Sequence, residues 1–138
     1  MNERIVYTSQ AAPGVGAREA YDIIRVSHNR NSQFGLTGAL IFLDDHFLQV
    51  LEGDGWQLRD RYAVIAADPR HTHVVLRQSI RIDRLSFPDE WMALRHGDGV
   101  SAATRLAFGY APGFPAPQFD GDGLAAFALA CCRDQAAA

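Results

Sequence analysis

A single glutamine, Gln49, stands in the middle of the apolar run from His46 to Gly53. The run is too short for a buried helix and shows no alternation of apolar and polar residues, so it predicts a strand buried on both faces. A buried primary amide has two donors and an acceptor, and leaving them unpaired would cost about 1–3 kcal/mol. We therefore expect Gln49 to have polar partners in the core.

Two other polar residues are placed to reach the same core. Tyr7 lies in the middle of the β-branched and aromatic run 4–9, which predicts a first strand. Asn31 ends a predicted helix over 17–31 and falls on the same face as Ile24. Taken singly, Tyr7 is typical of a core aromatic residue whose hydroxyl bonds to a backbone carbonyl. Asn31 alone is typical of a residue in the left-handed backbone conformation at the C-terminus of a helix.

The elements that position these residues follow the order β-α-β-β-α-β-β. The strands are predicted over 4–9, 39–43, 46–53, 74–82 and 91–94, and the helices over 17–31 and 54–67. This order is the ferredoxin-like plan of an α+β protein, an antiparallel sheet with two helices on one face.

A last helix is predicted over 124–133, capped by Asp122, after a Gly- and Pro-rich stretch with one helical turn near 102–107. It is apolar nearly all round, so the other face of the sheet or another subunit must cover it. We expect one domain over 1–96, followed by a loop and helix over 97–138 that pack on the sheet or on a partner subunit.

The composition limits the possible functions. The chain has 138 residues, a formal net charge of −3 and 48% hydrophobic residues, as in an ordinary globular domain. Its 13 basic residues, all of them arginines, are scattered along the chain, so nucleic-acid binding is disfavoured. No window approaches the roughly 18 apolar residues of a membrane span, and the first residues lead directly into a strand instead of a signal peptide. We expect a cytoplasmic protein without membrane association.

Histidines and cysteines suggest no further chemistry. The residues His28, His46, His73 and His96 have no metal-ligand spacing with cysteines or carboxylates, so we predict no metal site. Adjacent cysteines such as Cys131 and Cys132 seldom bridge each other, because the ring would strain the intervening peptide. We interpret them as small apolar helix residues, with redox sensing as the alternative.

Several short sequence motifs occur in order along the chain. They are Ile-Val-Tyr-Thr-Ser at 5–9, Asn31, Gly-Leu-Thr-Gly-Ala-Leu at 35–40, Phe-Leu-Gln-Val-Leu-Glu-Gly at 47–53, Asp-Pro-Arg-His at 68–71 and Phe-Pro-Asp at 87–89. In this order and at this spacing they resemble the BLUF family of flavin-binding blue-light sensors, in its short single-domain type. The resemblance covers roughly residues 3–95. It implies non-covalent binding of FAD, or of FMN or riboflavin, by the domain over 1–96.

The resemblance implies that Tyr7 and Gln49 are the photoactive pair. Equal strand parity is consistent with this, because it places both side chains on one face of adjacent strands. In the family's photochemistry, the light-excited flavin takes an electron and then a proton from the tyrosine through the glutamine. The amide of the glutamine is left rotated or tautomerised. The flavin carries this chemistry and no substrate is turned over, so we expect no enzyme activity.

The other residues expected around the flavin have different roles. They are Ile23, Ile24, Leu40 and Phe47 for apolar contact, Arg30 and Asn31 at the far edge of the ring, Arg70 and His71 at the cofactor's tail, and Met92 near Gln49. Ordinary core packing is the alternative for the apolar set, and a solvated loop for the Arg-His pair. A phosphate contact from Arg70 would favour FMN or FAD over riboflavin.

One departure from the family pattern concerns the segment before the last strand. The family often has Phe-Pro-Asp-Trp-Ser-Met, whereas this chain has Phe-Pro-Asp-Glu-Trp-Met at 87–92. A one-residue step in a strand turns a side chain to the opposite face. We therefore expect Met92 near Gln49, with Trp91, which follows Glu90, pointing toward the C-terminal helix or a partner.

Such a sensor must transmit its signal through a structural change at its surface. We expect light to alter the last strand and the segment 94–124, and so to shift a homo-oligomer or effector interface made partly by 124–132. The main alternative is a light-insensitive ferredoxin-like binding module. A small enzyme would need an acid/base cluster, and His71 with Asp68 is a weak one.

Overall fold

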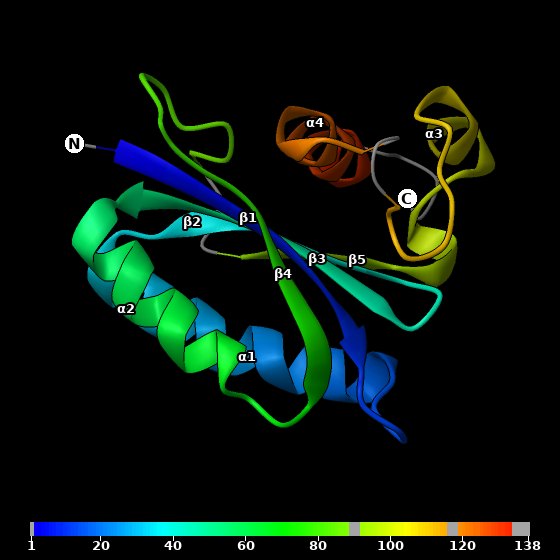
Figure 1. Ribbon diagram of the computed structural model, residues 1–138, viewed down its shortest axis with the longest axis horizontal. Coiled ribbons are helices and arrows are strands. Elements are labelled where there is room, and N and C mark those ends of the chain that lie inside the picture. Colours follow the sequence, from blue (N-terminus) through cyan, green and yellow to red (C-terminus); the bar gives the residue numbers. More distant parts are fainter. Residues whose placement is uncertain (1, 89–91, 116–118, 134–138) are drawn as a thin grey trace.

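The computed structural model describes residues 2–88, 92–115 and 119–133, without the side chains at 24, 25, 27–29, 32 and 98. In chain order its elements are β1 (Asn2–Ala11), α1 (Ala17–Phe34), β2 (Thr37–Leu43), β3 (His46–Asp54), α2 (Gly55–Ala66), β4 (His71–Arg81), β5 (Ala93–His96), the 3₁₀ turn η1 (Gly97–Gly99), α3 (Ala102–Ala107) and α4 (Gly121–Cys132). Figure 1 shows α1 and α2 on one side of the sheet and α3 and α4 on the other. The expected α+β, ferredoxin-like arrangement is confirmed.

The sheet has the strand order β4-β1-β3-β2-β5. The prediction that it is antiparallel holds for β1–β3, β1–β4 and β2–β3, but it is wrong for β2–β5, which is parallel. The reason is the path of the chain. Since β4 runs opposite to β1, and β1 and β2 both run opposite to β3, the chain leaves β4 at the end of the sheet where β2 begins. A strand that enters there beside β2 must run in the same direction as β2.

The hairpin between β2 and β3 depends on unusual backbone angles. Asp44 and Asp45 both have positive φ, 51° and 63°, as a two-residue hairpin turn of type I′ requires. Gly38 has φ 153°, and a Cβ there would lie 1.8 Å from the carbonyl oxygen of Val50. Only glycine allows β2 to approach β3 this closely.

The core has two layers, one on each face of the sheet. On β3, Phe47 and Leu51 belong to the layer beneath α1 and α2, whereas Leu48 and Val50 belong to the layer beneath α4. All four are almost fully buried. Burying such a side chain stabilises the fold by about 1.5–3 kcal/mol each. The lack of alternation in the β3 sequence thus follows from the cover on both faces.

Helix α4 covers the second face of the sheet within its own chain. Its residues Leu124, Phe127, Ala128 and Cys131 are fully buried and recur at three- and four-residue spacing. The predicted N-cap, Asp122, is wrong: the carboxylate of Asp120 accepts from the Gly123 amide at 2.6 Å. No helix in the described ranges is long and apolar enough to cross a bilayer.

A buried carboxylate, Glu52, connects several of these elements. Its Oε1 accepts hydrogen bonds from the backbone amides of Ser86, at 2.6 Å, and Phe87, at 3.2 Å. Its Oε2 lies 3.7 Å from Nη1 of Arg4. Arg4 in turn donates to Gln78 of β4 and to Asp122 of α4. Glu52 therefore holds the segment that leads to β5 against the centre of the sheet.

Replacing Glu52 is expected to destabilise the fold strongly. Glu52→Ala leaves two buried amides and the partly buried Arg4 without their acceptor, so the free energy of unfolding should fall by about 3 kcal/mol or more. Glu52→Gln keeps an oxygen for the amides and should cost about 1–2 kcal/mol. Asp122→Asn, at an exposed site, is the control and should cost less than about 1 kcal/mol. Urea unfolding measures all three, and a Glu52→Ala midpoint equal to the wild-type midpoint would contradict this role.

Candidate functional site

Tyr7 and Gln49 meet on the sheet face beneath α1 and α2. They are direct partners in the antiparallel register of β1 and β3, and each is only 3% exposed. The Tyr7 hydroxyl donates to Oε1 of Gln49 at 2.5 Å. On its other side, Nε2 of Gln49 donates to the sulfur of Met92 at 3.5 Å. The amide is thus held between a phenol and a thioether, with a second N–H left for another acceptor.

The expectation that Met92 lies next to Gln49 is confirmed. Met92 is buried and immediately precedes β5, the edge strand that pairs with β2. The residues Glu90 and Trp91, whose one-residue shift led to this expectation, lie outside the described residues. The orientation predicted for the Trp91 side chain stays a prediction.

Burial determines the protonation state of Tyr7. Loss of solvent raises its pKa far above the usual value for a phenol, and the neighbouring Tyr62 and Asp68 raise it further. The ring of Tyr62 lies 5.8 Å from that of Tyr7, centroid to centroid. Tyr7 is therefore a neutral hydrogen-bond donor at any physiological pH.

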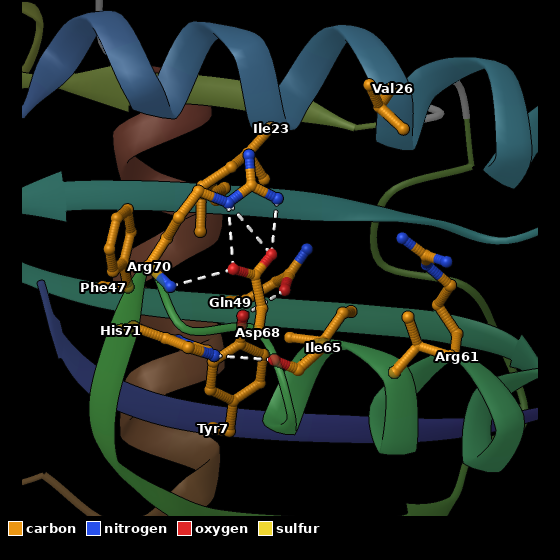
Figure 2. Close-up of a pocket in the computed structure, with 12 residues that line it drawn as sticks. Tyr7, Ile23, Val26, Phe47, Gln49, Arg61, Ile65, Asp68, Arg70 and His71 are labelled. Carbon is orange, nitrogen blue, oxygen red and sulfur yellow. Dashed lines mark hydrogen bonds and ion pairs between the residues drawn. The ribbon is translucent and has the colours of Figure 1, made fainter. Parts of the chain in front are cut away.

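A pocket opens between α1 and α2, with Tyr7 and Gln49 at its floor (Figure 2). It encloses about 540 Å³ including its open mouth. The lining residues are Tyr7, Ile23, Val26, Leu40, Phe47, Gln49, Arg61, Val64, Ile65, Asp68, Arg70 and His71. Pockets whose lining is mostly apolar with a few polar groups are typical of cofactor sites.

Most of the residues predicted to bind the cofactor lie together here. Seven of them line the pocket: Tyr7, Ile23, Leu40, Phe47, Gln49, Arg70 and His71. Asn31 is buried near the end of α1 and Arg30 is exposed, and neither is among the lining residues. The side chain of Ile24 lies outside the described part of the chain.

Sequence reasoning missed five of the lining residues as members of a site. They are Val26, Arg61, Val64, Ile65 and Asp68. A signal for three of them was present, because Arg61, Ile65 and Asp68 follow one another at helical spacing along one side of α2 and its end. Without the position of α1, that side could not be recognised as the wall of a pocket.

His71 is fixed by two hydrogen bonds. Its Nε2 lies 2.7 Å from the carbonyl oxygen of Ile65, and its Nδ1 lies 2.7 Å from Oγ of Ser9. Because a carbonyl only accepts, Nε2 carries a proton, and in the neutral ring Nδ1 accepts from the serine. The ring presents its edge to Tyr7 and Phe47. His71 therefore holds the tyrosine and the end of α2 in place.

Arg70 and Asp68 form an ion pair beside the pocket (Figure 2). Nε of Arg70 lies 3.0 Å from both carboxylate oxygens of Asp68, and Nη2 makes a further contact. These hydrogen bonds hold the pKa of Asp68 below its usual value and raise that of Arg70. Both groups thus stay charged, and the charge of each largely offsets that of the other.

The residues present suit a flat aromatic ring with a polar edge. The apolar side chains of Ile23, Leu40 and Phe47 provide a surface for the ring, and the Gln49 amide provides a hydrogen-bonding group at the floor. Val26 and Val64 are about half exposed at the mouth, where a bound ring would cover them. The described residues contain no cluster of three or more potential metal ligands.

Comparison with known proteins identifies similar sequences and folds. A family model described as BLUF, "Sensors of blue-light using FAD", matches residues 3–93. The chain is 34% identical over 87 residues to the photoactivated adenylate cyclase subunit beta of Euglena longa, covering 63% of this chain and 10% of that protein. It is 32% identical over 71 residues to the blue light- and temperature-regulated antirepressor BluF of Escherichia coli, covering 51% of this chain and 18% of that protein.

A solved structure matches over a greater length. The dark-state structure of BlrB, a BLUF protein, superposes with a TM-score of 0.74 at 25% identity, covering 94% of this chain and 96% of that chain. The C-terminal helices are therefore part of the shared fold. The chain itself spans only about a tenth to a fifth of the two curated relatives.

The raised pKa of Tyr7 should be visible in stability at high pH. The folded chain keeps the phenol proton at pH values where the unfolded chain releases it, so stability is unaffected below about pH 10 and falls above it. Relative to Tyr7→Phe, the wild type should lose about 1.4 kcal/mol per pH unit above that point. Urea unfolding from about pH 8 to about pH 11 tests this. Parallel pH curves for the two proteins would contradict it.

Proposed function

Because the chain belongs to the BLUF family and is a blue-light sensor that uses flavin, we propose that the Tyr7–Gln49 pair is its switch and that it signals to a protein partner. The observation that carries the proposal is the buried 2.5 Å hydrogen bond from Tyr7 to Gln49 at the pocket floor. It joins a neutral phenol to an amide that can be rearranged. A sensor of this kind is not an enzyme, since nothing is turned over.

We propose that the pocket between α1 and α2 holds the flavin. The residues in contact with it would be Tyr7, Ile23, Leu40, Phe47, Gln49 and Ile65, with Ile24, Arg30, Asn31, Arg70, His71 and Met92 as further candidates from the sequence. The apolar lining and the floor amide support this assignment. When bound, the flavin supplies absorption of blue light and an excited state that accepts an electron and a proton.

Tyr7 is the proposed source of the electron and the proton. Its phenol is protonated because burial raises the pKa, and within the described residues its hydroxyl donates directly to Gln49. A proton that leaves Tyr7 along this bond arrives at Oε1 of the amide, which stays neutral by releasing a proton from Nε2. The result is the imidic-acid tautomer, and return of a proton to the Tyr7 oxygen restores an amide that can have rotated; either form changes the donors and acceptors that Gln49 presents to its neighbours.

Met92 is the neighbour through which we propose that the change leaves the site. In the present orientation, Nε2 of Gln49 donates to the Met92 sulfur. After rotation an oxygen would face that sulfur, which accepts hydrogen bonds but has none to donate, so the contact would be lost. Met92 immediately precedes β5, and Arg95 of β5 donates from Nη2 to the carbonyl oxygen of Cys132 at 3.0 Å. A displacement at Met92 thus has a direct connection to the end of α4.

The partner is proposed from this route and from the relatives. One relative is a cyclase subunit and another an antirepressor, so the matched segment occurs in proteins of different activity. We propose that α4 and the segment 94–124 form an interface with a protein effector, or with a second copy of the chain, whose population light shifts. We also propose a cytoplasmic location, which suits the adjacent Cys131 and Cys132, since neighbouring cysteines are poorly placed to form a disulfide.

The absorption spectrum tests the switch. We expect the purified protein to show an oxidised flavin spectrum that shifts slightly to the red under blue light and returns in darkness. Tyr7→Phe and Gln49→Ala should bind flavin without this shift, because each removes one partner of the hydrogen bond. Tyr62→Phe is the matched control, an aromatic next to Tyr7 without a bond to Gln49, and should keep the shift. A shift that survives in Tyr7→Phe would reject the mechanism, and a protein that takes up no flavin would leave the light-insensitive binding module.

Hydrogen exchange in dark and light tests the route through Met92. In the wild type, illumination should change the exchange of the amides in β5 and α4, and it should change the oligomer size if a second copy is the partner. Met92→Leu has nearly the same volume but no sulfur acceptor, so it should keep the absorption shift while reducing the exchange response. Identical dark and light exchange in the wild type would contradict the route, as would an unaltered response in Met92→Leu.

A further inference from the structure

Arg61 is the cation of the pocket that has no acceptor. It lies on α2 one turn before Ile65 and lines the pocket with it. Its Nε is buried and makes no hydrogen bond within the part of the chain that the structure describes. Figure 2 shows the side chain extending from α2 toward Val26 of α1, on the other side of Gln49 from Arg70 in this view.

The charges around the pocket leave Arg61 in excess. Asp68 is the carboxylate among the lining residues, and Arg70 already binds it through Nε and Nη2. The second cation nearby is Arg30 of α1, which is exposed and lies one turn beyond Val26. Burial lowers the pKa of Arg61, and the positive charge of Arg30 lowers it further. The positive charges of Arg61 and Arg30 therefore repel each other, and an anion bound near both would relieve this repulsion.

The position of this excess charge coincides with the open side of the pocket. Val26 and Val64 are 48% and 55% exposed, whereas Tyr7, Leu40 and Phe47 at the floor are almost fully buried. Arg61 lies three residues before Val64, and Arg30 four residues after Val26, so both cations are on the same helical faces as the exposed valines. A flat ring bound at the floor would have to send any long substituent out on this side.

Resting on the function proposed above, we propose that Arg61, assisted by Arg30, binds the phosphate of the flavin nucleotide at the mouth of the pocket. The protein would then select FMN and FAD, which share this phosphate, over riboflavin, which lacks it. Guanidinium is the side-chain group that best matches phosphate, through paired charge-assisted hydrogen bonds. Arg70 differs from Arg61 because its hydrogen bonds are already made with Asp68.

The proposal predicts a ratio of affinities. Titration of the flavin-free wild-type chain with FMN and with riboflavin should give a dissociation constant about tenfold or more lower for FMN. In Arg61→Gln the ratio should fall toward one through loss of FMN affinity, with riboflavin affinity unchanged. Arg61→Lys keeps the charge without the paired donors and should give an intermediate ratio. Raising the salt concentration should weaken FMN binding more than riboflavin binding.

Two further arginines provide controls for this titration. Arg59 is on the same helix, but it donates to Glu3 and lies over the ring of Trp56, outside the pocket. Arg59→Gln should therefore leave the ratio unchanged. Arg70→Gln separates the two candidate phosphate ligands, and a ratio that falls in this variant but not in Arg61→Gln would overturn the proposal.

The remaining outcomes are distinct from one another. If Arg61→Gln weakens FMN and riboflavin equally, Arg61 contacts the ring and the phosphate assignment is wrong. If the wild type binds both flavins with equal affinity, the proposed selectivity for FMN over riboflavin is wrong, while the photoreceptor function stands. If neither flavin binds the wild type, the proposed function itself fails.

Discussion

Burying the Gln49 amide has a free-energy cost that the arrangement of the strands must offset. The amide is almost fully buried, and Tyr7 and Met92 satisfy it from opposite sides. Both partners are far from Gln49 in sequence, since Tyr7 lies in β1 and Met92 lies just before β5. The pairing therefore requires β1 and β3 to be neighbours and the chain to return to the far edge of the sheet. The fold and the proposed switch thus depend on the same pairing.

Cover on both faces of the sheet makes this pairing possible. With α1 and α2 on one face and α4 on the other, β3 carries buried apolar residues on both of its faces, and water is excluded from the tyrosine and the glutamine. Exclusion of water raises the pKa of Tyr7, so that the phenol keeps its proton and donates it in the hydrogen bond to Gln49. The C-terminal helix is thus a structural requirement of the site as well as the proposed output element.

Charged groups divide into those that hold the fold and those left for a ligand. Glu52 and Arg4 connect β3, β1 and the segment at Ser86. Arg70 and Asp68 form an ion pair just after the end of α2. In each case the ion pair is supplemented by hydrogen bonds to backbone amides, which is the condition under which a buried or half-buried charge is tolerated. Nε of Arg61 lacks such a partner in the described structure, and this contrast is the basis for the proposal that it binds a phosphate.

The class of the fold could be predicted from the order of the elements, and the central pair from the resemblance to the BLUF family. A glutamine inside an apolar strand needs polar partners, and the strand parity of Tyr7 is consistent with its being one of them. The turn at Asp44–Asp45 and the helical turn at 102–107 were also predictable, because each depends on its local sequence alone. Three features became known only from the tertiary structure. They are the parallel pairing of β5 with β2, the capping of α4 by Asp120 in place of Asp122, and the packing of α4 on the sheet of its own chain. The tertiary structure also decided that Arg61 and Val26, from different helices, share one pocket. Periodicity assigns a residue to a face of its own element, but which faces meet depends on how distant elements pack.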